Sequence, residues 1–195
     1  MNLEQAAREL EAAIKQAKKL RPGGRILVAI DGRCASGKTA LAESLKNKTG
    51  CTVFHMDDYF LRPEQRTPER FKTPGGNVDR ERFFSELLAP LKSGKEEVEF
   101  RKYDCRTGKL LPAVRVVPGD TVVIEGSYSC HPDLAGEYDI KVFLTVGKDE
   151  QARRIEKRNG RSAAAIFQTK WIPLEEEYFR AFGIGPKSDM VFELN

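Results

Sequence analysis

An eight-residue glycine-rich motif constrains this chain more than any other feature of its sequence. Residues Gly32 to Thr39 read Gly-Arg-Cys-Ala-Ser-Gly-Lys-Thr and match the pattern G-x-x-x-x-G-K-[ST]. The motif directly follows an apolar run, Ile26 to Ile30, and directly precedes Ala40-Leu41-Ala42. This context predicts a buried strand, a tight phosphate-binding turn and the start of a helix. The competing interpretation, a glycine-rich turn with a chance lysine, does not account for the full match.

The residue types of this loop suit the binding of phosphate groups. Glycines let backbone N–H groups surround phosphate oxygens, and the N-terminus of the helix adds a partial positive charge. Lys38 can reach the β- and γ-phosphates, and the Thr39 hydroxyl can coordinate Mg²⁺. The predicted site for ATP (or another nucleoside triphosphate) with Mg²⁺ comprises Gly32, Arg33, Cys34, Ala35, Ser36, Gly37, Lys38 and Thr39. The motif alone does not identify the phosphoryl acceptor.

Apolar runs and amphipathic stretches alternate along the rest of the chain. Further strands are expected at 52–54, 122–124, 140–144 and 190–192, and helices at 38–48, 79–92, 148–159 and 174–182. An amphipathic helix is expected within residues 1–22, ahead of the first strand. The alternation predicts a single α/β domain over 1–195, with an open parallel sheet of about five strands flanked by helices.

Two segments interrupt this alternation. Residues 61–78 are polar and rich in Pro and Gly, which predicts a long loop on the acceptor side of the site. Residues 97–117 read as a β-hairpin with its turn near 106–108. No repeat or linker divides the chain.

Composition excludes several classes of protein. The longest fully apolar run is Ile26 to Ile30, too short to cross a bilayer, and the N-terminus lacks a signal-peptide core, so we expect a cytoplasmic protein without a membrane partner. Lys and Arg number 33 against 29 Asp and Glu, an excess too small for a nucleic-acid binder. The four cysteines lack zinc-ligand spacing. The small excess of positive charge is consistent with a pocket that binds a polyanionic small molecule.

Acidic residues follow two of the expected strands. Asp57 and Asp58 come after the second strand, and Glu125 ends the run 122–124. Ligands of open α/β sheets lie beyond the carboxyl ends of the strands. Phosphoryl transfer to a hydroxyl needs a carboxylate that accepts its proton and another beside the metal. We therefore expect Asp57 to be the base and the Mg²⁺ ligands to be Thr39, Glu125 and Asp57; helix capping is the competing role.

Five short motifs occur in a distinctive order. They are Gly32–Thr39, Asp57-Asp58-Tyr59-Phe60, Gly75-Gly76-Asn77-Val78-Asp79, Tyr103-Asp104 and Ile124-Glu125-Gly126. In this order, over residues 26–190, the chain resembles the uridine kinase family of P-loop nucleoside kinases. The resemblance implies a P-loop nucleoside triphosphate hydrolase fold of the nucleoside kinase type, with a β-hairpin insertion and a helical lid at 148–162.

The resemblance also implies roles for individual residues. Asp57 would accept the proton of the sugar 5′-hydroxyl, and Asp79 would hold the ribose 2′- and 3′-hydroxyls, although Asp79 can also cap the following helix. Tyr103 and Asp104 would lie at the nucleobase, with Phe60 in the same acceptor pocket. Among the basic residues of the lid, Arg154 and Arg158 lie four apart on one helix face and can clamp phosphates. With Asp57 and Lys38, they form the expected catalytic set.

The acceptor stays open because one family feature is missing. Family members have a histidine in the hairpin, where this chain has Arg106-Thr107-Gly108. The stretch from Asp57 to Phe60 also resembles the Asp-Asp-Phe-Phe of nicotinamide riboside kinases. The sequence therefore predicts a kinase for a nucleoside like uridine or cytidine, with nicotinamide riboside, pantothenate or a sugar phosphate as alternatives.

A different class of function also fits the loop. The triphosphate could control binding to a partner, as in a regulatory ATPase, although the guanine-reading N-K-x-D motif is absent from the sequence. The N-terminal helix could pack on its own domain or pair with a second subunit, so a homo-oligomer stays open.

Overall fold

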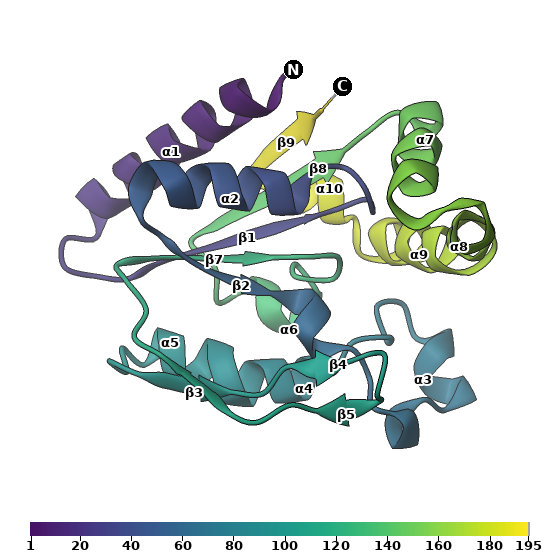
Figure 1. Cartoon of the computed structure of the whole chain (residues 1–195). Helices are drawn as coiled ribbons and strands as arrows, with labels where there is room; N and C mark the ends of the chain where they lie inside the picture. Colours follow the sequence, from purple (N-terminus) through teal and green to yellow (C-terminus); the bar gives the residue numbers. More distant parts are fainter. Residues whose placement is uncertain (195) are drawn as a thin grey trace.

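A five-stranded parallel sheet forms the centre of the molecule in the computed structural model, which describes residues 1–194 (Figure 1). Its strands are β1 (Ile26–Gly32), β2 (Thr52–His55), β7 (Thr121–Glu125), β8 (Ile140–Thr145) and β9 (Met190–Glu193). They lie in the order β2-β7-β1-β8-β9, and every neighbouring pair is parallel. The predicted open parallel sheet is confirmed.

Strand β1 lies in the middle of this sheet, as its continuous apolar sequence predicts. All seven of its residues are buried, because β7 and β8 pair with its two edges and helices cover both faces. At the edge, β9 pairs only with β8 and leaves Val191 more than half exposed. The strand that leads into the phosphate-binding motif is thus enclosed along its whole length.

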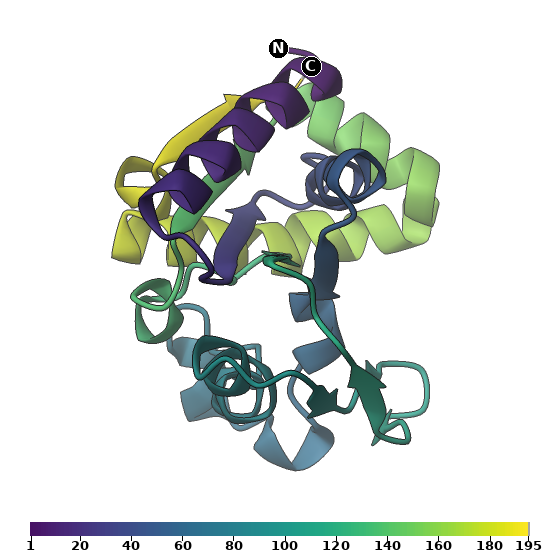
Figure 2. The same ribbon diagram turned by 90° about the vertical axis from the view of Figure 1, so that its left-hand side faces the viewer.

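Two long helices cover one face of the sheet (Figures 1 and 2). Helix α1 (Leu3–Leu20) starts with a capping box between Asn2 and Gln5 and buries Ala6, Leu10 and Ile14. These residues join one core cluster with the β1 side chains of even number and with α2 (Lys38–Thr49). The apolar stripe of the N-terminal helix therefore packs on its own domain.

Shorter helices cover the other face. They are α4 (Arg80–Phe83), α5 (Ala89–Lys92), α6 (Pro132–Ala135), α9 (Ile172–Phe182) and α10 (Ile184–Lys187). The helix expected at 79–92 is present, but a π-helical turn, η3 (Phe84–Leu88), joins α4 to α5. Pro90 has no N–H to donate to the carbonyl of Glu86, so the regular α-helical bond is missing at this point. Phe83, Leu87 and Tyr178 lie in the core on this face.

The two interruptions of the alternation have their own structure. The segment 61–78 holds a 3₁₀ turn, η2 (Pro63–Gln65), and helix α3 (Pro68–Lys72), so it is more ordered than the expected loop. The hairpin forms as expected and contains two antiparallel pairs. These pair β3 (Val98–Phe100) with β6 (Val114–Val116) and β4 (Tyr103–Asp104) with β5 (Lys109–Leu110).

The helices after β8 form one continuous arm. Helix α7 (Lys148–Asn159) ends at Gly160, and α8 (Arg161–Ile166) leads through a π-helical turn, η4 (Phe167–Trp171), directly into α9. Most of the segment between the helices expected at 148–159 and 174–182 is therefore helical as well. Neither α8 nor η4 contains a buried residue, so this part of the arm stands away from the core.

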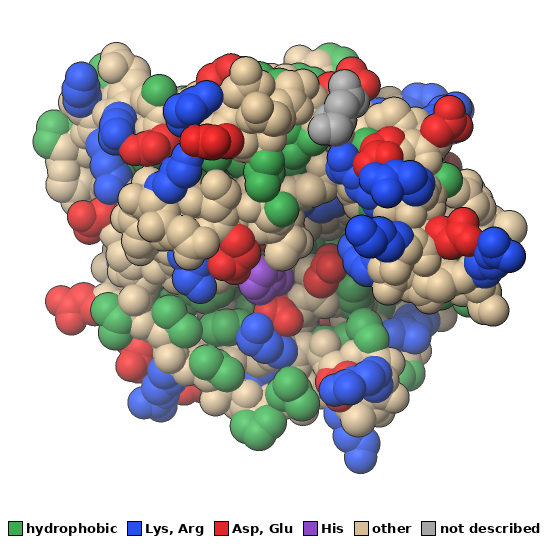
Figure 3. Space-filling model, turned by 45° about the horizontal axis from the view of Figure 1, so that its top comes forward, with side chains coloured by type: hydrophobic (Ala, Val, Ile, Leu, Met, Phe, Trp, Pro, Cys, Tyr) green, Lys and Arg blue, Asp and Glu red, His purple; other side chains and the backbone are tan. Residues whose placement is uncertain are grey.

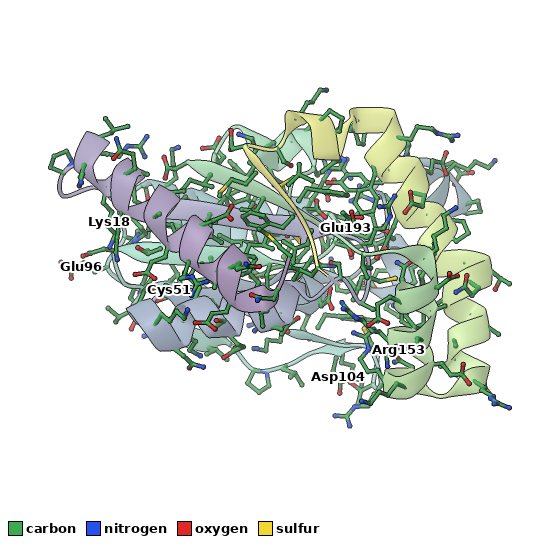
Figure 4. The ribbon with its side chains drawn as sticks, turned by 90° about the horizontal axis from the view of Figure 1, so that it is seen from above. Lys18, Cys51, Glu96, Asp104, Arg153 and Glu193 are labelled. Carbon is green, nitrogen blue, oxygen red and sulfur yellow. The ribbon has the colours of Figure 1, made fainter. Side chains whose placement is uncertain are left out.

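The carboxyl ends of the parallel strands point toward one end of the molecule (Figure 1), where residues of this arm and of the hairpin line the same cavity. Seen from above, Asp104 of the hairpin and Arg153 of α7 both lie toward that end, opposite Lys18 and Glu96 (Figure 4). Among residues 1–194, no helix combines the length and apolar character needed to span a membrane.

Candidate active site

The phosphate-binding loop joins β1 to α2 in a conformation that its glycines make accessible. Gly32 has φ +138°, and a Cβ there would lie 2.0 Å from the carbonyl oxygen of Leu144. Gly37 has φ +101° and Ala35 φ +58°, both in the left-handed region. The backbone N–H groups in the first turn of α2 have no partner within the helix, as at any helix N-terminus. The loop therefore has the shape of an anion-binding cradle.

Lys38 is held at the mouth of this cradle. Its Nζ donates to the carbonyl oxygens of Gly32 (2.7 Å) and Arg33 (3.0 Å) and to Ser127 Oγ (3.3 Å). The side chain is almost fully buried. An ammonium group fixed in this way places one positive charge at the loop.

A hydroxyl, a carboxylate and an imidazole meet beside Lys38. Thr39 Oγ1 donates to Glu125 Oε1 at 3.1 Å, and the same oxygen lies 2.6 Å from His55 Nδ1. Strands β2 and β7 place His55 directly opposite Glu125. The hydrogen bond to Glu125 raises the pKa of His55. The sequence pattern missed His55 as a partner of Glu125, because only the strand order brings them together.

Asp57 projects from a 3₁₀ turn, η1 (Met56–Tyr59), that continues β2 into the cavity. Its side chain is exposed on the cavity wall, and partial desolvation there raises its pKa above the usual value. Lys38 opposes this rise in the pKa, and the negative charges of Glu125 and Glu175 add to it. The arrangement makes Asp57 a stronger base than a fully solvated aspartate.

The donor set suits Mg²⁺. A hydroxyl and carboxylates are the hard oxygen ligands that this ion prefers, and it usually retains water and phosphate oxygens as further ligands. Thr39 and Glu125 are hydrogen-bonded to each other, and Asp57 lines the same cavity. These residues fit Mg²⁺ bound together with a triphosphate.

Helix α9 and helix α7 hold the loop from two sides, which the sequence pattern did not predict. Glu175 Oε2 accepts the Cys34 N–H at 2.9 Å, and its Oε1 accepts the Ser127 hydroxyl at 2.7 Å. Gln151 of α7 donates to the Cys34 carbonyl at 3.0 Å. The side chain of Arg33 pairs with Glu176 (Nε to Oε1, 2.5 Å). Helices α7 and α9 are thus both attached to the phosphate loop.

Asp31 is a second residue that sequence reasoning missed. It is fully buried at the end of β1 and accepts four hydrogen bonds, from the N–H groups of Gly32, Tyr128 and Cys130 and from the Tyr178 hydroxyl. Burial raises its pKa to about 6. Its signal in the sequence was an acidic residue inside an otherwise apolar strand, directly before the loop.

The two expected lid arginines take different positions. Arg154 donates to Glu150 at 2.7 Å and to the carbonyls of Ala35 and Leu194, each at 3.3 Å, so it lies against the phosphate loop. Arg158 donates to Asn159 and lies 5.8 Å from the Phe167 ring. Both line the cavity.

A cavity of about 790 Å³ connects these groups. A space-filling view shows a hollow with acidic and basic side chains at its rim (Figure 3). Of the expected site residues, those that line the cavity are Cys34, Ala35, Gly37, Lys38, Thr39, Asp57, Phe60, Glu125, Arg154 and Arg158. The structure therefore brings residues of the phosphate loop, the expected base Asp57 and one expected acceptor residue, Phe60, into one cavity.

The other expected acceptor residues do not line the cavity. Asp79 is 2% exposed and caps α4 by accepting the Arg82 N–H. Tyr103 is buried, and its hydroxyl accepts from Arg66 at 2.8 Å. Asp104 accepts the N–H of Arg106 within the hairpin turn. The capping role considered for Asp79 is present.

Comparison with known proteins supports the fold. No family model and no curated protein matches the chain. A solved structure of a candidate fructose transport system kinase from Silicibacter sp. TM1040 is similar, with a TM-score of 0.73 and 23% identity over 98% of this chain and 99% of that one. A possible uridine kinase from Bacillus stearothermophilus has a TM-score of 0.66 and 23% identity over 94% and 99%.

A more distant structure agrees with these two. Phosphoribulokinase from Rhodobacter spheroides has a TM-score of 0.59 and 13% identity, over 87% of this chain and 70% of that one. Together with the loop and the sheet order, these similarities show that the chain has the fold of P-loop kinases.

Proposed function

We propose that this chain is an ATP-dependent kinase that transfers the γ-phosphoryl group to a hydroxyl group of a small acceptor. The observation that carries the proposal is the single cavity that Lys38, the Thr39–Glu125 pair and Asp57 share. This cavity brings together the phosphate loop, oxygen ligands of the kind that Mg²⁺ prefers and a carboxylate that could act as a base. The resemblance of the motifs to uridine kinases makes the 5′-hydroxyl of a nucleoside like uridine or cytidine the first acceptor to test.

Each residue would have a defined task. The loop amides and Lys38 would bind the phosphates of ATP, and Arg154 would add positive charge from the lid side. Thr39 and Glu125 would hold Mg²⁺, with Asp57 beside them; the bound ion would neutralise phosphate charge. Asp57 would accept the proton of the acceptor hydroxyl, and its raised pKa suits that role.

The test is ADP release from ATP–Mg²⁺ with a panel of acceptors. The panel holds uridine, cytidine, nicotinamide riboside, pantothenate and ribulose 5-phosphate. One acceptor should stimulate ADP release, and Asp57→Asn should lower that stimulated rate by about 10²-fold or more. The matched control is Asp58→Asn, in the same turn, because Asp58 pairs with Lys102 at 3.0 Å. This variant should keep most of the activity.

The opposite result would favour the regulatory alternative. If no acceptor stimulates ADP release and Asp57→Asn leaves a slow ATP hydrolysis unchanged, then Asp57 is not the base. The bound triphosphate would then control a conformation or a partner.

A further inference from the structure

The acceptor end of the cavity differs from what a neutral nucleoside requires. Asp79, the expected ribose ligand, accepts the Arg82 N–H at 3.2 Å and Arg82 Nε at 3.3 Å, with Arg62 Nε 3.9 Å away. Asp104 accepts the Arg106 N–H at 2.9 Å. Both carboxylates therefore have protein partners, and neither lines the cavity.

Arg66 instead presents a cation to this end of the cavity. Its Nε donates to the Leu61 carbonyl at 3.0 Å, and Nη2 donates to the Tyr103 hydroxyl at 2.8 Å. These two bonds orient the guanidinium plane. Among the described residues, Nη1 has no hydrogen-bond partner and Arg66 has no carboxylate partner. Arg66 is exposed and lines the cavity, so one edge of its guanidinium group is free to pair with a ligand.

Lys170, in the π-helical turn η4, supplies a second cation. Its Nζ lies 4.5 Å from the Trp171 ring and 5.6 Å from the ring of Phe71, which belongs to α3. Within residues 1–194 no carboxylate forms an ion pair with it. Aromatic faces attract an ammonium group without neutralising it. Of the two cations, Arg66 thus lies between η2 and α3, and Lys170 lies in η4.

Carboxylates near the phosphate loop would orient an anionic acceptor in the cavity. Glu125 and Glu175 bond to residues of the phosphate loop, and Asp57 lines the cavity with them. Lys38, Arg154 and Arg158 also line this cavity and are assigned to the phosphates of ATP, so with ATP bound Arg66 and Lys170 are the remaining cations available to the acceptor. An acceptor with an anionic group at one end would be repelled by the carboxylates and attracted by the cations. Its anionic end would then point away from Asp57 and leave a hydroxyl free to approach that residue.

We infer that the acceptor is a small hydroxylated molecule with an anionic group, a phosphate or a carboxylate, which binds between Arg66 and Lys170. A planar guanidinium edge and an ammonium group both pair with such oxyanions. Phe60, Phe71 and Trp171 cover the less polar part of the molecule. The inference rests on the proposed kinase function, because Asp57 marks the position of the reacting hydroxyl.

Binding can be measured separately from catalysis, because Trp171 is the only tryptophan of the chain and lines this cavity. Saturating ADP–Mg²⁺ would first occupy the phosphate loop. Matched probes would then be titrated against tryptophan fluorescence: ribose 5-phosphate against ribose, and pantothenate against its neutral alcohol, pantothenol. At least one anionic probe should bind with an affinity about tenfold or more above that of its neutral counterpart.

Variants assign the binding to the two cations. Lys170→Gln and Arg66→Gln should each weaken binding of the anionic probe about tenfold and leave the neutral probe unaffected. Arg66→Lys keeps the charge but loses the fixed guanidinium plane, so it should bind with intermediate affinity. The matched control is Lys72→Gln, an exposed lysine at the end of α3 that does not line the cavity.

Three results of the binding experiments would overturn the inference: equal binding of the charged and neutral probes, no saturable response to either anion, or wild-type affinity in both glutamine variants. The failure of the proposed function looks different. In that case the anion binds and depends on Arg66 and Lys170, but no acceptor stimulates ADP release. A neutral nucleoside that is phosphorylated at the same rate in both variants would overturn the inference and leave the kinase intact.

Discussion

The two ends of the cavity are built in different ways. At the phosphate end, eight consecutive residues form the loop, and buried groups from α7, α9 and β1 hold it in place. At the acceptor end, side chains come from α3, the hairpin and η4, which are short elements outside the central sheet. The proposed phosphoryl transfer would thus depend on a contiguous backbone loop held by buried groups, whereas the choice of acceptor would depend on side chains that lie outside the central sheet.

The strongest test of this difference concerns Asp31, which no ligand would touch. Asp31→Asn replaces one acceptor oxygen by an NH₂ group that faces the Cys130 N–H and the Tyr178 hydroxyl. The tyrosine hydroxyl can rotate, but the buried Cys130 N–H loses its partner, which costs about 2–3 kcal/mol of unfolding free energy. Urea unfolding would measure the loss, with Tyr178→Phe as the control that removes only one of the four bonds.

The pH dependence of that loss has a defined sign. Burial raises the pKa of Asp31 from 3.8 to about 6, so the folded state binds its proton more tightly than the unfolded state does. The resulting stabilisation is complete below pH 3.8 and is lost as the pH rises through 6. The asparagine side chain of Asp31→Asn does not titrate, so the variant should be more destabilised relative to wild type at pH 5 than at pH 7.5. A difference that is independent of pH would contradict the raised pKa.

A smaller effect, on the turnover number, is expected from a substitution where α9 contacts the phosphate loop. In Glu175→Gln the side-chain oxygen can still accept the Cys34 N–H, but its NH₂ group would donate to Ser127 Oγ. Ser127 Oγ would then accept from this NH₂ group as well as from Lys38, and its proton would turn to the Gly32 carbonyl, which also accepts from Lys38. The hydrogen bonds that position Lys38 would change, and one negative charge near it would be lost. We expect the acceptor-stimulated turnover number to fall about tenfold while the KM for the acceptor stays constant.

The control for this prediction lies two residues away. Glu177 is on the same helix and does not line the cavity, so Glu177→Gln should keep the full rate. If Glu175→Gln changes only the thermal stability, then the residue supports the fold and does not position Lys38.

The phosphate end was predictable in part because its backbone is contiguous. The Gly32–Thr39 motif, the buried strand before it and the helix after it follow directly from local sequence, as do the five strands of the sheet. His55, Gln151 and Glu175 were not predicted as partners of the loop, since each comes from an element far away in the sequence. Strand order and helix packing bring them together, and no local pattern encodes those distances.

The residues expected at the acceptor end stay predictions, for a physical reason. The resemblance assigned Asp79, Tyr103 and Asp104 to the acceptor, but each has a protein partner in this structure. Whether a polar side chain serves a ligand or a neighbouring residue depends on competing hydrogen bonds, which the motif does not specify. Arg66 and Lys170 belong to none of the sequence motifs. They differ from other surface cations only in lining this cavity.

The smallest expected effect concerns the loop that supports the acceptor end. Arg70 pairs bidentately with Glu81 at 2.8 and 2.7 Å and also donates to the carbonyls of Gly76 and Val78. The pairing with Arg70 lowers the pKa of Glu81 to about 2. Because the Glu81 side chain is 58% exposed, solvent screens the pair, and Glu81→Gln should cost less than about 1 kcal/mol of unfolding free energy.

The sign of this effect with pH is opposite to that of Asp31. A lowered pKa means that the stabilisation is present above pH 4.5 and is lost as the pH falls toward 2. Urea unfolding at pH 7 and pH 3 should show the difference between Glu81→Gln and wild type shrinking at the lower pH, while the exposed Glu69→Gln control stays close to wild type at both. A loss as large as that of Asp31→Asn would show that the acceptor end is held as firmly as the phosphate end, and the distinction between the two ends would fail.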